Sequence, residues 1–207
     1  MFSRKDLFFS LITGCYAGLI AWRILVFLEK PDVWGVSLAW LAVAIPILWV
    51  LGVNLGYFLG RWMPFFNQFG KFAAIGFTNA AIDFGVLNLL IAVSGIAAGV
   101  YFSAFKSISF MAGVMHSYLW NRVWVFKSSS QNKKQEFVKF FTVILLSSLV
   151  NVGVASLVVN FVDPWFSFDE KVWANIGAIV GSAMALVFSF VGFRLIVFQK
   201  TPTQSNI

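Results

Sequence analysis

Six long apolar stretches follow one another along the chain and limit its possible folds more than any other feature. A helix crosses the core of a bilayer with about 20 apolar residues, so each stretch predicts one transmembrane helix. The composition agrees, because 60% of the 207 residues are hydrophobic and 11% are charged, against roughly a quarter charged in a soluble domain. We expect an all-α integral membrane protein with six transmembrane helices and almost no soluble part. The predicted spans are Leu7–Leu28, Val33–Leu59, Phe72–Val93, Ala104–Phe126, Phe137–Phe161 and Val172–Phe198.

The first stretch could be mistaken for a secretory signal peptide, because the basic residues Arg4 and Lys5 precede it. Its apolar part is longer than the roughly 7–15 residues of a signal peptide, and no small-residue cleavage site follows it. We therefore expect this helix to be retained.

Charged residues alternate between the connecting segments, and this alternation predicts the orientation. Residues 1–6, 60–71, 127–139 and 199–207 carry Arg4, Lys5, Arg61, Lys71, Lys127, Lys133, Lys134, Lys139 and Lys200. The opposite segments carry Lys30, Lys171 and the acids Glu29, Asp32, Asp163, Asp169 and Glu170. Because basic loops remain in the cytoplasm, we expect both termini in the cytoplasm and the chain in the cytoplasmic membrane. The net charge of +7 then requires no nucleic-acid partner.

The last four stretches contain an internal repeat. Two segments recur: Phe69–Phe72 returns as Phe137–Phe140, and Ser117–Phe126 returns as Ser189–Phe198. Each copy comprises two spans, so both copies begin on the same side of the membrane. The sequence therefore predicts two parallel-topology helical hairpin repeats, related by a pseudo-twofold axis along the membrane normal, plus an added N-terminal hairpin.

This repeat resembles the GtrA-like family of small membrane proteins over roughly residues 66–200. The first copy carries the family's pattern N-R-x-W-V-F at Asn121–Phe126, whereas the second has Phe193 in place of Asn, and its Asn151 aligns with Asp83. We therefore expect the polar residues that bind a ligand to lie mainly in the first copy. The resemblance implies three parts: an N-terminal transmembrane hairpin at residues 1–65, a GtrA-like four-helix transmembrane domain at 66–200 and a cytoplasmic tail at 201–207.

The resemblance also implies a function. Members of this family are connected with moving polyprenyl-phosphate-linked monosaccharides across the membrane, for cell-surface polysaccharide or cell-wall glycosylation. Related four-span units also occur fused to polyprenyl-phosphate sugar transferases. A polyprenyl-phosphate sugar lipid is therefore the expected ligand, and a membrane glycosyltransferase is an expected partner.

Asp83 is the sharpest candidate for a binding residue, because a carboxylate in the middle of a span costs roughly 3 kcal/mol or more unless it faces a cavity or a partner. Asn79 lies one turn before it on the same face. A carboxylate and an amide together suit the recognition of sugar hydroxyls. The alternative is a structural pair in which a cation of another helix neutralises Asp83.

Basic residues at the cytoplasmic helix ends are candidates for binding the lipid phosphate, since Arg can hold a phosphate with a bidentate fork. This set comprises Arg122, Arg194, Lys71 and Lys139, with Asn121 as a second donor beside Arg122. The alternative is that these cations serve membrane topology only.

Small residues at helical spacing predict close packing between helices. They form the ladders Ser109-x3-Gly113-x3-Ser117, Gly177 to Ser189, Gly14-x3-Gly18 and Gly52-x3-Gly56-x3-Gly60. We expect packing within the monomer, and a homo-oligomer is the alternative for the glycine ladders. Lys106 continues the first ladder and is expected to reach the outer head groups or a ligand. His116, the only histidine, predicts a packed or hydrogen-bonded residue rather than a metal site.

Three functions remain open from the sequence. The first is a flippase for lipid-linked sugars or an essential part of one. The second is a non-transporting anchor or partner of a membrane glycosyltransferase, and the third is a proton-coupled exporter of small solutes. Enzymatic activity, a metal and a cofactor are not expected, because the sequence contains no nucleophile–base pair, metal-ligand cluster or phosphate-binding glycine loop.

Overall fold

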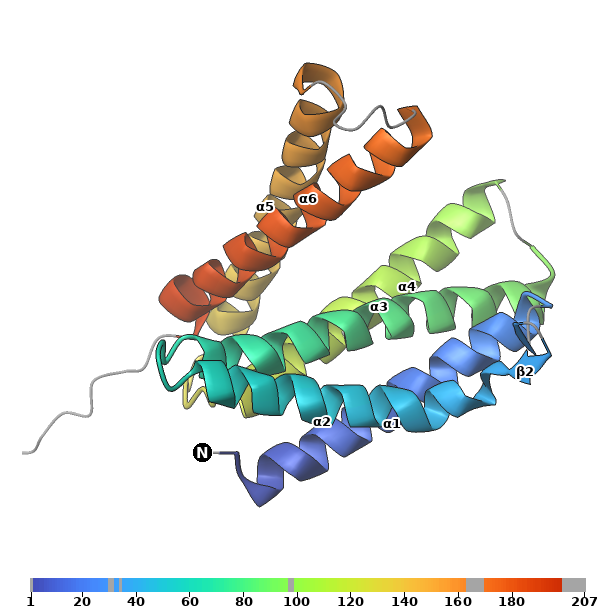
Figure 1. Ribbon diagram of the computed structural model, residues 1–207. Helices are drawn as coiled ribbons and strands as arrows, with labels where there is room; N and C mark the ends of the chain where they lie inside the picture. The colour runs from blue at the N-terminus through green and yellow to red at the C-terminus, as the bar shows by residue number, and fades with distance from the viewer. Residues whose placement is uncertain (1, 30–31, 34, 97–98, 163–169, 199–207) are drawn as a thin grey trace, which may run out of the picture. The chain divides into compact units, whose positions relative to one another are not determined.

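The computed structural model describes residues 2–29, 32–33, 35–96, 99–162 and 170–198. Helices dominate these ranges (Figure 1). The six long ones are α1 (Arg4–Phe27), α2 (Leu41–Leu59), α3 (Phe66–Ser94), α4 (Gly99–Trp120), α5 (Lys133–Phe161) and α6 (Glu170–Gly192). The short elements are β1 (Asp32–Val33), β2 (Val36–Ser37), η1 (Leu38–Trp40), η2 (Asn121–Val125) and η4 (Phe193–Val197).

Four helical segments in the described part are long and apolar enough to cross a membrane, judged by length and composition. They are Arg4–Phe27, Leu38–Leu59, Phe66–Ser94 and Val180–Val197. The chain is therefore a multi-pass, all-helical membrane protein. Crossing by α4 and α5, and the side on which the termini lie, remain predictions.

The predicted spans and the observed helices differ most at the starts of the second and third. The second span does not begin at Val33, because Asp32–Val33 pairs with Val36–Ser37 in a two-stranded antiparallel ladder. Gly35 closes this hairpin with φ of +77°, a conformation that glycine adopts without strain. The third helix begins at Phe66, before the predicted Phe72. The polar residues Asn67, Gln68 and Lys71 end the apolar stretch, but polar residues are compatible with a helix, and α3 starts directly after Phe65.

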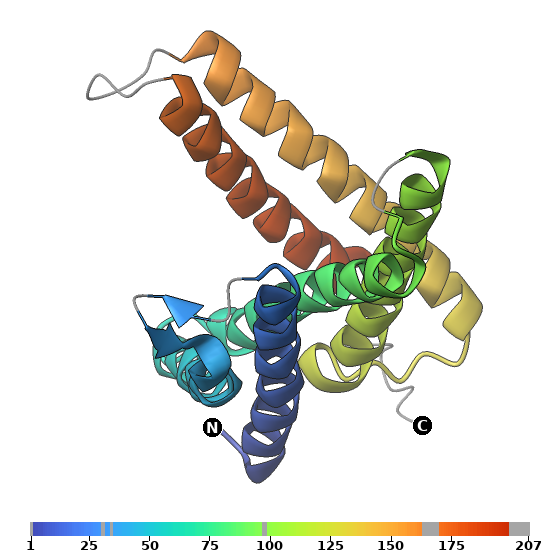
Figure 2. The same cartoon turned by 90° about the vertical axis from the view of Figure 1, so that its right-hand side faces the viewer.

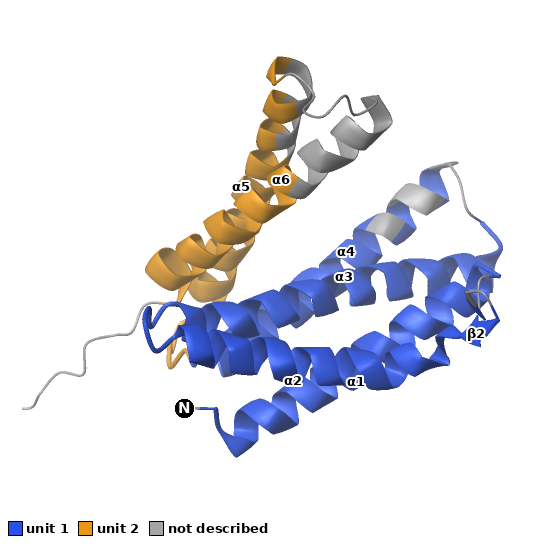
Figure 3. Ribbon diagram, in the orientation of Figure 1, with its two compact units in different colours: residues 1–127 blue, residues 128–207 orange. Residues whose placement is uncertain are grey.

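The chain divides into two compact units, residues 1–127 and residues 128–207 (Figure 3). In unit 1 the helices α1 to α4 alternate in direction and pack on one another (Figures 1 and 2). In unit 2, α5 packs on α6. The N-terminal hairpin therefore forms one compact unit with the first repeat copy, so residue 65 is not a boundary between compact units. The three-part division drawn from the family resemblance remains a prediction about sequence relationship.

Glycines bring the helices of unit 1 into close contact. A Cβ atom added to Gly14 would lie 2.4 Å from Pro46 Cα, and one added to Gly18 would lie 2.5 Å from the Leu41 carbonyl oxygen. A Cβ on Gly56 would lie 2.8 Å from the Phe66 carbonyl oxygen. Because real Cβ atoms do not approach so closely, these positions require glycine. Packing of the glycine ladders within the monomer, as predicted, is confirmed at these three positions.

Each repeat copy ends in a π-helical turn, η2 after α4 and η4 after α6. The Phe126 N–H donates to the Asn121 carbonyl oxygen at 2.9 Å, and the Phe198 N–H donates to the Phe193 carbonyl oxygen at 2.8 Å. The two turns begin 72 residues apart, the same offset as Arg122 and Arg194 in the sequence repeat. The repeat therefore extends to this local backbone structure. The predicted pseudo-twofold axis is a relation between the two units and remains a prediction.

Candidate functional site

The two predicted sugar-binding residues lie on the same face of α3 and contact α4. Ser109 Oγ donates to Asp83 Oδ1 at 2.6 Å. One turn earlier, Asn79 Oδ1 lies 2.6 Å from His116 Nδ1. Asp83 and Asn79 are both half-buried, whereas Ser109 is fully buried. The structure thus brings the predicted pair together and joins it to polar side chains of the neighbouring helix.

Tyr16 of α1 extends this cluster, because its Oη hydrogen-bonds His116 Nε2. The Oδ1 of Asn79 can only accept, so Nδ1 of His116 carries a proton and donates to it. In a neutral imidazole Nε2 is then the acceptor, and the Tyr16 hydroxyl donates to it. The amide NH₂ of Asn79 makes no hydrogen bond to the residues that the structure describes. The polar chain Tyr16–His116–Asn79 therefore holds Asn79 with its donors available to a ligand.

The small residues of α4 make these contacts possible. A Cβ atom on Gly113 would lie 3.4 Å from the Asn79 carbonyl oxygen and 3.7 Å from Asp83 Cβ. Ser109 and Ser117, one turn to either side, are buried. The predicted packing seam is confirmed for this ladder, and Ser109 also donates to Asp83. The side chain of Lys106 and the surroundings of Gly177 lie outside the described part of the structure.

A second polar cluster lies at the end of unit 1 where α1 and α3 begin. Asp6 Oδ1 is 2.5 Å from Lys71 Nζ, and both side chains are only 4% exposed. Trp124 Nε1 donates to Asp6 Oδ1 at 2.9 Å, and Tyr57 Oη donates to Asp6 Oδ2 at 3.0 Å. Ser3 completes the set: its N–H donates to Asp6 Oδ2 at 3.0 Å and its Oγ at 2.7 Å. The carboxylate therefore has a full set of donors, as a buried charge requires.

The Asp6 cluster contains Lys71, one of the residues predicted to bind the lipid phosphate. Lys71 was expected at a cytoplasmic helix end with its charge available, whereas the structure pairs it with Asp6 of the N-terminal hairpin. Asp6 was not among the predicted site residues. One local signal pointed to it: Ser3 and Asp6 form a capping box, which places an acid three residues after the helix cap. A role for Lys71 in phosphate binding remains a prediction. Lys71 would have to contact the phosphate while paired with Asp6, or exchange Asp6 for the phosphate.

The other predicted phosphate ligands differ in exposure. Arg122 is half-buried in η2, whereas Arg194 in η4 and Lys139 in α5 are exposed. Asn121 is fully buried, and its Nδ2 lies 2.8 Å from the Ser117 carbonyl oxygen and 3.2 Å from Ser117 Oγ. To bind a phosphate, the Asn121 amide would have to leave Ser117. Lys139 and Arg194 belong to unit 2, so their grouping with Lys71 and Arg122 remains a prediction.

Comparison with known sequences identifies the family. The family described as GtrA/DPMS, transmembrane domain, matches residues 71–204. The chain belongs to this family. The uncharacterized membrane protein YngA of Bacillus subtilis (strain 168) is 30% identical over 138 residues, which cover 62% of this chain and 78% of that protein. No solved structure matches.

The family match divides the site residues into two groups. Lys71, Asn79, Asp83 and the residues of η2 lie inside the range matched by the GtrA/DPMS family. The hydrogen-bond partners Asp6, Tyr16 and Tyr57 precede this range. The N-terminal hairpin therefore supplies contacts to both polar clusters of the GtrA/DPMS domain.

Proposed function

We propose that this GtrA/DPMS-family protein moves a polyprenyl-phosphate-linked monosaccharide across the cytoplasmic membrane, for cell-surface polysaccharide or cell-wall glycosylation. The observation that carries the proposal is the pair of polar contacts, Asp83 with Ser109 and Asn79 with His116, between two helices of a protein that is otherwise mainly apolar. Ionisable groups within membrane helices mark pathways for substrates or ions.

The roles of the residues follow from their chemistry. Asp83 accepts hydrogen bonds from sugar hydroxyls, and the Asn79 amide donates to them. Arg122 binds the lipid phosphate at the end of unit 1, with Lys71, Asn121, Arg194 and Lys139 as further ligands. The prenyl chain remains in the bilayer, so only the sugar and the phosphate cross. This process requires neither covalent chemistry nor a cofactor.

The proposed placement of the phosphate ligands at the inner leaflet depends on the orientation, with both termini in the cytoplasm. Reporter fusions after Ile207 and within residues 128–133 should both give a cytoplasmic signal. A signal from the outer side at either position would reject the six-span topology with both termini in the cytoplasm.

The function is tested by reconstituting the purified protein in liposomes with prenyl-phosphate sugars labelled on the sugar. Labelled sugar in the inner leaflet is protected from a membrane-impermeant reagent, and the protein should accelerate its exchange over protein-free liposomes. No acceleration with any of the sugars tested would reject flipping by the isolated chain. In that case, co-purification with a membrane glycosyltransferase would support the alternative of a non-transporting partner.

A further inference from the structure

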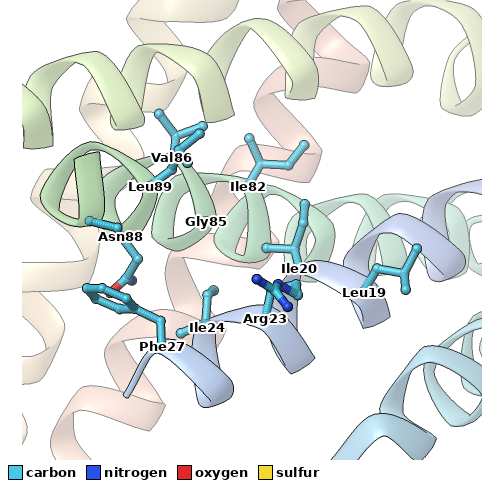
Figure 4. A pocket seen from close by; sticks show the side chains of 11 residues that line it. Leu19, Ile20, Arg23, Ile24, Phe27, Ile82, Gly85, Val86, Asn88 and Leu89 are labelled. Carbon is cyan, nitrogen blue, oxygen red and sulfur yellow. The ribbon is translucent and has the colours of Figure 1, made fainter. Parts of the chain in front are cut away.

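An apolar groove runs between α1 and α3 in unit 1. Its volume is about 480 Å³, within the range of ligand pockets. Figure 4 shows its walls, formed by Leu19, Ile24 and Phe27 of α1 and by Ile82, Val86 and Leu89 of α3. Within the groove the two helices approach closely beside Gly85, where an added Cβ would lie 2.5 Å from Ile20 Cγ2. The lining of α1 from Leu19 to Phe27 spans roughly 12 Å, enough for a segment of one hydrocarbon chain.

Two polar side chains, Arg23 and Asn88, also line this groove (Figure 4). Arg23 is exposed and forms no ion pair within the part of the chain that the structure describes. Its guanidinium carbon lies 5.9 Å from the centre of the Trp22 ring. Asn88 Nδ2 donates to the Phe84 carbonyl oxygen at 2.8 Å. The groove thus combines apolar walls with one cation that is not neutralised by a described carboxylate.

Arg23 and Asn88 both lie near the C-terminal ends of their helices, where a membrane-spanning helix is expected to meet the lipid head groups. Arg23 precedes the end of α1 at Phe27 by about 6 Å along the helix axis, and Asn88 precedes the end of α3 at Ser94 by about 9 Å. Lys71 lies near the opposite end of α3. From Lys71 to Asn88 the helix rises by about 26 Å, close to the roughly 30 Å of a bilayer core.

We propose that the α1–α3 groove binds a single-chain lipid phosphate, with the phosphate on Arg23 and the prenyl chain along the apolar walls. The choice of ligand rests on the proposed function. Arg binds phosphate with charge-assisted hydrogen bonds. An arginine that only extends to the head groups does not require an adjacent apolar groove, whereas Arg23 lines one. The site gives the lipid a second head-group position, in the leaflet opposite Lys71, and the N-terminal hairpin supplies its cation.

The test uses the full-length protein in phosphatidylcholine liposomes with a polyprenyl monophosphate that carries a diazirine on its chain. After illumination, peptide mapping should place the label on residues 19–27 and 82–92. Arg23→Gln should reduce this labelling about tenfold, the change expected for loss of one charge-assisted contact. Arg61→Gln removes an exposed charge outside the groove and should leave the labelling unchanged.

Two further comparisons test the shape of the site and the identity of its ligand. Ala92 lines the groove and is exposed, so Ala92→Phe should block labelling without disturbing the packed helices. Unlabelled polyprenyl phosphate should compete, whereas the matching polyprenol and diacyl phosphatidic acid should not. Equal competition by polyprenol would show an apolar groove that does not recognise phosphate, and equal competition by phosphatidic acid would show a general anionic-lipid site. Either result overturns the proposal, as does equal labelling in Arg23→Gln and the wild type.

Transport measured on the same liposomes separates this proposal from the proposed function. Labelling that depends on Arg23 without any sugar translocation supports the groove and removes the flippase function. Translocation by a protein whose groove is not labelled supports the function and overturns the groove.

Discussion

The two repeat copies share the structure of their last turn but differ in how their polar residues are held. Asn121 and Phe193 both open a π-helical turn, and both are buried. The aromatic replacement is explained by packing, since Phe193 stacks on Phe140 with ring centres 4.4 Å apart. In contrast, Lys71 is buried in an ion pair, whereas its counterpart Lys139 is exposed.

The middle of each hairpin shows the same contrast. Asp83 is bonded to a buried serine at 2.6 Å, whereas its counterpart Asn151 donates to the exposed Ser182 at 3.2 Å. The π-helical turn is therefore common to both copies, whereas the polar contacts differ between them. In the first copy Lys71 and His116 take polar partners from α1, namely Asp6 and Tyr16, and Tyr57 of α2 donates to the same Asp6. Four predictions test this contrast, from the largest expected effect to the smallest.

Replacing the repeated lysines should affect stability very unequally. Lys71→Met leaves the Asp6 carboxylate buried without its cation and should lower the free energy of unfolding by about 3–5 kcal/mol. Lys139→Met removes an exposed charge and should change it by less than about 0.5 kcal/mol. Unfolding of the detergent-solubilised variants measures both values. The double variant Asp6→Asn with Lys71→Met should regain part of the loss, and equal effects of the two lysines would break the comparison.

Replacing the carboxylate of the first copy by the amide of the second should separate function from folding. Asp83→Asn keeps the shape and an acceptor for Ser109, so the protein should stay folded while sugar translocation falls at least about tenfold, as for loss of a charged hydrogen bond. Asn151→Ala is the matched control in the second copy and should leave translocation near the wild-type rate. A loss of stability in Asp83→Asn would instead indicate that the carboxylate balances a buried cation. Unchanged transport and stability would remove Asp83 from the site.

The repeated arginines should differ in lipid-phosphate binding. Arg122→Ala should weaken binding of polyprenyl phosphate about tenfold, because an arginine–phosphate contact is charge-assisted. Arg194→Ala should weaken it by less than about twofold, since this exposed side chain is well solvated. Binding to liposomes with increasing amounts of the lipid measures both. Equal small losses would assign both arginines to membrane topology alone.

Tyr16→Phe should have the smallest effect and tests the contribution of the N-terminal hairpin to the site. Loss of the hydroxyl leaves His116 Nε2 without its donor and should cost about 1 kcal/mol of stability. The orientation of Asn79 should loosen, so the substrate concentration for half-maximal translocation should rise more than the maximal rate falls. Tyr101→Phe, at an exposed tyrosine of α4, is the control for loss of a hydroxyl. Identical kinetics in Tyr16→Phe and the wild type would show that Asn79 acts without the polar chain.

Part of the candidate site could be predicted from the sequence. The sequence pattern placed Asn79 and Asp83 on one helical face, because a spacing of four residues is a local property of a helix. The prediction for His116 was a packed or hydrogen-bonded residue, and the structure shows hydrogen bonds to Tyr16 and Asn79, which the sequence did not identify as partners. The sequence pattern missed the start of the second span, because Asp32–Ser37 contains apolar residues that the hydropathy pattern does not distinguish from a helix. The π-helical turns carried no recognisable signal, although their positions follow the repeat.

Long apolar stretches and motif spacing were enough to predict a helical membrane protein of the GtrA/DPMS family, and the arrangement of its repeated hairpins stays a prediction. These properties depend on stretches of consecutive residues, in which apolar length and motif spacing are read directly. Which polar side chains meet could be learned only from the packing of the helices. Asp6 and Trp124 are 118 positions apart in the chain, and Tyr16 and His116 are 100 apart. Their contacts depend on which faces of the helices pack together, and small residues such as Gly14, Gly56 and Gly113 set how closely these faces approach.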